Sequence, residues 1–246
     1  MSGDAATAGG TDGDQFFATE EALALYMERI EDPELFPAER KAIDRHFADP
    51  PASVLDVGCG VGRVASLLAD RGFDVTGIDV SEPFVERARS LFPDVEFRVA
   101  DARDTPFATG TFDHVVFSFF GLDYVRPESE REATLREIRR VLKPGGTFVF
   151  STHNSWHPVV PTSPRDVLSC GYDVVDLYLR RKNHDRLFSR YKLESVPLGD
   201  IETYVSNPAH QFRQLRDCGF TPVEVVGEHE GRRRFFERQP HFVARK

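Results

Sequence analysis

The residues of this sequence with the clearest chemical purpose stand in the segment 54–62, Val-Leu-Asp-Val-Gly-Cys-Gly-Val-Gly. An apolar run typical of a buried strand passes into three alternate glycines and then into a helical pattern. Glycines at such a turn permit positive φ angles and let backbone amides approach a ligand closely. The segment therefore predicts a cofactor-binding loop made of Gly58, Gly60 and Gly62, in which the small Cys59 serves packing rather than chemistry.

Two neighbouring residues, Arg63 and Asp56, distinguish between the ligands that such a loop can bind, and Asp79 suits both. A dinucleotide site favours Gly-x-Gly-x-x-Gly, whereas here the last of those positions is Arg63. Asp56, directly before the loop, would repel a pyrophosphate but would suit a ligand with an ammonium group and a sulfonium, as in S-adenosylmethionine (SAM). Asp79 follows the next predicted strand, where a carboxylate can accept hydrogen bonds from both ribose hydroxyls of either cofactor. The pattern favours SAM over NAD.

Alternating strands and helices must position these residues. The hydrophobic pattern predicts strands at 53–57, 73–78, 95–99, 112–119 and 147–152, with helices at 61–71 and 127–142. Ser81 and Pro83 mark the start of a further helix after the second strand. This alternation requires a mostly parallel sheet with helices on both faces. With closing strands at 220–226 and 241–245, we expect a Rossmann-like α/β fold with a seven-stranded sheet.

The segments outside the alternation define the remaining organisation. Residues 1–14 have the Gly, Ala, Asp and Thr composition of a disordered tail. Helical segments occupy 15–50 and are expected over the cofactor site, while 51–152 form the cofactor-binding core. The alternation stops over 153–207, which we interpret as a substrate lid inserted after the fifth strand. Residues 208–246 supply a helix and strands that complete the core.

Composition restricts the partners and the compartment. A formal net charge of −9 argues against a broad nucleic-acid-binding face. No stretch approaches the length and apolarity of a membrane span. Cys59, Cys170 and Cys218 are odd in number and far apart, which predicts neither a disulfide framework nor a metal site. We therefore expect a protein of a reducing compartment, the cytoplasm.

The segment 54–62 resembles the first motif of the class I SAM-dependent methyltransferases. Later segments resemble the family's other motifs in the same order, at 77–81, 100–102, 112–116 and 142–147. The resemblance implies that Asp79, followed by Val80, holds the ribose. It also implies that Asp101 receives the adenine amino group with the Ala102 amide nearby. Methyl transfer from SAM to an acceptor is the reaction that it implies.

Candidates for the acceptor side follow the fourth and fifth strands, because ligands of such sheets bind beyond the carboxyl ends of the strands. Phe119 and Phe120 are expected in the core or on an apolar surface facing the cofactor. His153, the first residue past the fifth strand, is a candidate catalytic base that would project into the cleft. Alternatively, His153 hydrogen-bonds the neighbouring loop.

The sequence also bears on the acceptor. The fourth strand lacks the Asn/Asp-Pro-Pro-Tyr/Phe sequence typical of transfer to the exocyclic amines of nucleic-acid bases. Together with the acidic net charge and the inserted lid, this favours a small-molecule acceptor. The alternatives are methylation of RNA or protein, or SAM binding without methyl transfer.

Overall fold

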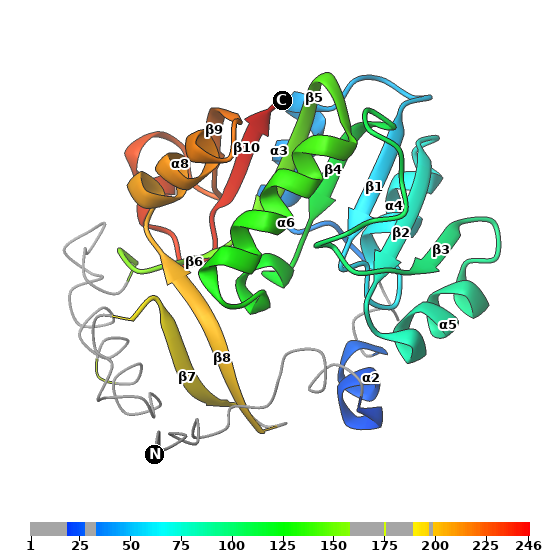
Figure 1. The fold of residues 1–246 in the computed structure, drawn as a ribbon, viewed down its shortest axis with the longest axis horizontal. Coiled ribbons are helices and arrows are strands. Elements are labelled where there is room, and N and C mark those ends of the chain that lie inside the picture. The colour runs from blue at the N-terminus through cyan, green and yellow to red at the C-terminus, as the bar shows by residue number, and fades with distance from the viewer. Residues whose placement is uncertain (1–18, 28–32, 158–174, 176–188, 197–198) are drawn as a thin grey trace, which may run out of the picture.

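The centre of the fold is a seven-stranded sheet with the order β3-β2-β1-β4-β5-β10-β9 (Figure 1). The strands are β1 (Ser53–Val57), β2 (Asp74–Asp79), β3 (Glu96–Val99), β4 (Phe112–Phe117), β5 (Leu142–Ser151), β9 (Thr221–Val226) and β10 (His241–Arg245). The first five run parallel, and β10 is antiparallel to both of its neighbours, β5 and β9. The predicted Rossmann-like, mostly parallel sheet is therefore confirmed.

This computed structural model describes residues 19–27, 33–157, 175, 189–196 and 199–246. The predicted tail at 1–14 lies outside the described residues. So does much of the predicted lid at 153–207, including Cys170.

Helices cover both faces of the sheet because successive strand residues point to opposite sides. Val54 and Val116 pack with α3 (Pro37–His46), α4 (Arg63–Asp70) and α5 (Glu82–Leu91). Leu55 and Val115 pack on the other face with α6 (Glu128–Val141) and α8 (Pro208–Asp217). The short α2 (Glu20–Met27) lies near one end of the sheet, where Ala22 contacts Val61 and Phe84 (Figure 1). Within the described ranges, none of the helices has the length and apolarity needed to cross a membrane.

Two strand boundaries differ from the predicted ones by more than one residue. We expected the fourth strand to reach Phe119, but β4 ends at Phe117 because Phe119 and Phe120 adopt the left-handed region, with φ of 49° and 63°. The fifth strand begins at Leu142 instead of Thr147, since a register shift lets the Lys-Pro-Gly-Gly segment join it.

A smaller sheet of order β6-β8-β7 lies beside the main one and contains the described strands of the predicted insertion. These are β6 (His153–Asn154), β7 (Tyr191–Val196) and β8 (Gly199–Ser206). The pair β7–β8 extends away from the main sheet (Figure 1). The Tyr191 hydroxyl donates to the Val125 carbonyl at 2.8 Å, and Arg126 pairs with Glu202 at 2.8 Å. The hairpin is thus fastened to the segment that follows β4.

Candidate cofactor site

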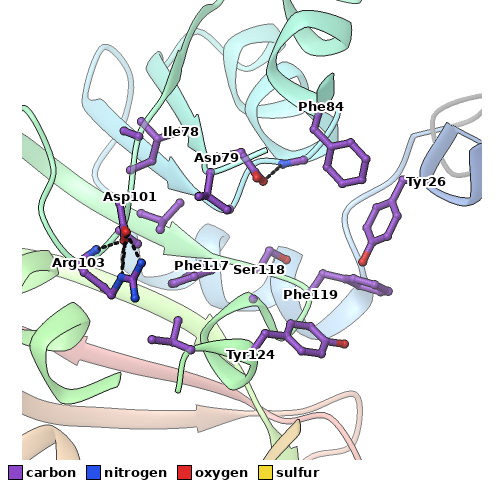
Figure 2. Close-up of a pocket in the computed structure, with 18 of the residues that line it drawn as sticks. Tyr26, Ile78, Asp79, Phe84, Asp101, Arg103, Phe117, Ser118, Phe119 and Tyr124 are labelled. Carbon is purple, nitrogen blue, oxygen red and sulfur yellow. Dashed lines mark hydrogen bonds and ion pairs between the residues drawn. The ribbon is translucent and has the colours of Figure 1, made fainter. Parts of the chain in front are cut away.

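A cavity opens at the carboxyl ends of β1, β2, β3 and β4, where the loops of a parallel sheet gather (Figure 2). The space between its lining residues, open mouth included, is about 970 Å³. Most of the predicted cofactor residues line it, namely Gly58, Gly60, Asp79, Val80, Asp101, Ala102 and Phe119. Tyr26 of α2 also lines it, and no sequence signal pointed to that residue.

Asp79 joins the glycine-rich turn to the start of the next helix. Its Oδ2 accepts a hydrogen bond from the Gly60 amide at 2.8 Å, and its Oδ1 accepts one from the Ser81 amide at 2.9 Å. Ser81 is the N-cap of α5, as the sequence predicts. The carboxylate at the end of β2 is therefore held in a fixed orientation while it lines the cavity, as a ribose-binding residue requires.

Asp56 lies in a second, smaller cavity that adjoins the first and also contains Cys59 and Arg63. The Asp56 side chain is 1% exposed, and neither carboxyl oxygen has a hydrogen-bond partner of good geometry. Burial raises the pKa of Asp56 to about 8, although Arg63 and the Ala65 amide, in the first turn of α4, favour the charged form. A buried carboxyl group without a partner is costly, so the site calls for a donor or a cation. The ammonium and sulfonium of SAM fit this requirement.

Arg63 also belongs to the site, although the sequence marked it only as the position where a dinucleotide loop would have glycine. Its guanidinium donates to Oε2 of the buried Glu39 at 3.0 Å and lies 4.5 Å from the centre of the Phe36 ring. The Ser118 hydroxyl also donates to Glu39. Burial acts to raise the pKa of Glu39, but the Arg63 ion pair outweighs it and holds that pKa below its usual value. The pair links α3 to the glycine-rich turn.

Gly62 has a structural role, and its contact with the cofactor stays a prediction. It is not among the residues lining either cavity, and its amide donates to the Cys59 carbonyl at 2.9 Å. Its φ of 91° precedes α4, and a Cβ there would come within 2.9 Å of the Phe97 ring. Only glycine satisfies both conditions without strain.

Asp101 faces the first cavity but already binds Arg103 (Figure 2). The Arg103 Nη2 lies 2.5 Å from the Asp101 Oδ2, and hydrogen bonding from Arg103 lowers the pKa of Asp101. An adenine amino group would therefore share this carboxylate with a guanidinium. Ala102 lies beside it in the lining, as predicted.

His153 was expected to project into the cleft, but it lines neither cavity. Its Nδ1 lies 2.9 Å from Oδ2 of the buried Asp123, and its backbone amide donates to the same oxygen at 2.8 Å. Its ring is 4.3 Å from that of Phe120. These contacts agree with the alternative interpretation, in which His153 braces the neighbouring loop. A catalytic role for His153 stays a prediction.

Residues 54–146 match a protein-family model described as a methyltransferase domain. The fold matches that of a SAM-dependent methyltransferase from Methanosarcina mazei, with a TM-score of 0.67 and 24% identity over 87% of this chain and 98% of the other. The chain therefore contains a methyltransferase domain, and its fold is that of the class I SAM-dependent methyltransferases. SAM is therefore the cofactor that the two cavities are expected to hold.

Two sequence relatives of this methyltransferase carry names that specify a reaction. Demethylmenaquinone methyltransferase of Beutenbergia cavernae is 37% identical over 142 residues, which are 57% of this chain and 55% of the relative. A 2-methyl-6-phytyl-1,4-hydroquinone methyltransferase of Synechocystis sp. is 42% identical over 109 residues, which are 43% of this chain and 33% of the relative. The matches thus span about half of the first relative and a third of the second.

SAM binding to this methyltransferase is expected to release a proton from Asp56. The carboxyl group, with a pKa of about 8, is mostly protonated at pH 7, and a cation beside it would favour the charged form. Binding must then deprotonate Asp56 below pH 8. Affinity should therefore rise with pH from 6 to 8, by up to about tenfold per unit, and level off above. Calorimetry in buffers of different ionisation enthalpy measures the proton release.

The matched control is Asp56→Asn, which keeps the shape of the side chain but cannot titrate. Titration of the amino group of SAM itself is common to both proteins, so the difference between them isolates Asp56. Equal proton release by the wild type and by Asp56→Asn would contradict the assignment.

Proposed function

We propose that this chain transfers a methyl group from SAM to a small-molecule acceptor. The observation that carries the proposal is the buried, unpartnered carboxyl group of Asp56 next to the cavity of Asp79 and the glycine-rich turn. The names of the two relatives, which refer to demethylmenaquinone and to a substituted hydroquinone, support an acceptor of low molecular weight. The free, buried thiols of Cys59 and Cys218 support a reducing compartment, the cytoplasm.

The protein contributes mainly alignment and exclusion of water. SAM, when bound, supplies a methyl group on a sulfonium whose leaving group is a neutral thioether. Asp79 would hold the ribose, and Asp56 would pair with the positive charge of the methionine part. Tyr26 and Phe119, whose rings meet edge to face with centres 5.9 Å apart, would cover the cavity from the solvent.

We further propose that the segments 15–50 and 153–207 complete the site. Tyr26 supports this for the first segment, because it brings α2 to the cavity. For the second, the hydrogen bond from Tyr191 and the ion pair of Glu202 fasten β7 and β8 to Val125 and Arg126, which line the cavity. Through these two contacts the insertion would influence the binding of the cofactor as well as the binding of the acceptor.

The test is transfer of a labelled methyl group from SAM into a cell extract that is afterwards separated into small molecules, nucleic acid and protein. We expect label in the small-molecule fraction, and clearly less of it with Asp79→Ala as the control enzyme at a limiting concentration of SAM. Label confined to RNA or protein would refute the proposed acceptor class. SAM binding without transfer into any fraction would instead indicate a protein that binds SAM without transferring its methyl group.

The variant His153→Ala distinguishes a structural role of His153 from a role as catalytic base. We expect the variant to lose about 1 kcal/mol of stability, because it loses a hydrogen bond to the buried Asp123. Turnover should fall less than tenfold, and the acidic limb of the pH profile should remain. His153→Gln can still donate to Asp123 and should recover part of the stability. A hundredfold loss of turnover with a flattened acidic limb would make His153 the base.

A further inference from the structure

A third cavity lies next to the cofactor site, and Phe119 lines all three cavities. The third cavity is formed by the residues around the start of α3, the turn after β4, the ends of β5 and β10, and the loop 227–240 between β9 and β10. The space between its lining residues, open mouth included, is about 810 Å³. Because Phe119 lines this cavity and the other two, a ligand in the third cavity would lie close to one in the first.

His241 is the polar group in this cavity that most needs a ligand. The residue is 5% exposed, and neither ring nitrogen has a hydrogen-bond partner. It faces Ser151, its cross-strand neighbour in the β5–β10 pair, and both residues line the cavity. Buried polar groups in folded proteins are almost always hydrogen-bonded, so an unsatisfied imidazole at a cavity wall indicates a missing partner.

The protonation state of His241 defines what that partner must be. Burial lowers its pKa to about 4, with Glu39 and Glu237 acting against this shift and Arg63 acting with it. The ring is therefore neutral near pH 7 and presents one donor and one acceptor nitrogen. A hydroxyl group can satisfy either nitrogen, because it both donates and accepts.

Aromatic rings supply the apolar walls. Phe36 and Phe119 are stacked with their centres 5.9 Å apart, and the centre of the Phe120 ring is 5.4 Å from that of Phe119. Phe119 and Phe120 both have positive φ, a strained conformation that is concentrated at ligand sites. The Phe120 amide donates to the Ser151 hydroxyl at 3.0 Å, which fixes this turn. Flat walls of this kind favour a flat apolar ligand.

The loop 227–240 is held in place over the cavity. The Glu237 carboxylate accepts hydrogen bonds from the Glu228 amide at 2.8 Å and from the His229 amide at 2.7 Å. Gly227 leaves room for the same carboxylate, since a Cβ there would come within 2.4 Å of it. These hydrogen bonds fix the part of the loop that lines the cavity.

We propose that this third cavity binds the methyl acceptor, and that the acceptor is a planar aromatic compound whose hydroxyl group hydrogen-bonds His241. The inference rests on the proposed function and adds to it the place and the chemical class of the acceptor. On this inference the acceptor is recognised mainly by the loop 227–240. Of the described residues of the insertion 153–207, His157 lines the cavity.

The test uses full-length protein saturated with S-adenosylhomocysteine and two probes of similar shape, 2-naphthol and 2-methylnaphthalene. We expect the wild type to bind 2-naphthol at least fivefold more tightly, and His241→Phe to lose this difference. His241→Phe should keep its melting temperature or raise it, because an apolar ring replaces an unsatisfied polar one. Its affinity for S-adenosylhomocysteine should stay within twofold of the wild type.

Two further variants control for indirect effects. His114 is another buried histidine, but its Nε2 accepts a hydrogen bond from the Ala48 amide and its ring stacks on Phe47, away from the cavity. His114→Phe should lower the melting temperature and leave the preference for 2-naphthol intact. Phe36→Ala, which removes one wall, should weaken the binding of both probes by about fivefold or more.

The outcomes separate this inference from the proposed function. If the wild type does not bind 2-naphthol, or if His241→Phe retains the preference, the inference is wrong even when labelled methyl enters small molecules. If the preference depends on His241 but label never enters small molecules, the proposed function is wrong and the acceptor assignment fails with it, while the cavity stands as a ligand site.

Discussion

Asp79→Ala is expected to weaken SAM binding at least tenfold. The change removes a charged acceptor for both ribose hydroxyls, and hydrogen bonds to charged groups contribute about 1.5–3 kcal/mol each. It also removes the carboxylate that holds the Gly60 and Ser81 amides, so the glycine-rich turn loses its support. Calorimetric titration with SAM and with S-adenosylhomocysteine measures the loss.

Asp74→Ala is the matched control for this prediction. Asp74 is the first residue of the strand that Asp79 ends. Its side chain is exposed at the amino end of that strand, away from the cavity. Its removal should leave SAM affinity within twofold. A variant Asp79→Ala that stays folded and binds SAM like the wild type would show that this carboxylate does not hold the ribose.

Arg131→Met is expected to destabilise the protein by about 3–5 kcal/mol. Arg131 is 0% exposed and pairs with the buried Asp123 at 3.0 Å. It also donates to Gln211 and Gln214 of α8, and its guanidinium lies 4.2 Å from the centre of the Tyr204 ring. Methionine fills similar volume but leaves the Asp123 charge without its cation. Chemical denaturation followed by circular dichroism measures the difference.

Arg136→Met on the same helix is the control. Arg136 is exposed and pairs only one turn away with Glu132, an arrangement that contributes about 0.3–0.5 kcal/mol. Similar destabilisation by the two variants would mean that helix propensity, not the buried ion pair, accounts for the effect. A loss below about 1 kcal/mol in Arg131→Met would show that Asp123 finds another partner.

The local sequence pattern determined those elements whose conformation depends mainly on residues close to them in the chain. The glycine-rich turn at 58–62, the strand before it and the carboxylate of Asp79 follow from short-range rules of hydrophobic periodicity and turn chemistry. The order of strands and helices then restricts the sheet to a parallel, Rossmann-like arrangement. Fold and cofactor class were therefore predictable from the sequence alone.

Tertiary structure decided which distant side chains meet and which groups lack a partner. Glu39 and Arg63 are 24 positions apart, and no periodicity links them. His153 was expected in the cleft because it follows a strand end, but the buried Asp123–Arg131 pair holds it elsewhere. His241 was predicted only as part of a closing strand, and its unsatisfied ring became visible once β10 was paired with β5 beside the cavity. Burial and hydrogen-bond satisfaction depend on every element that surrounds a group, and so they emerge only when the chain is folded.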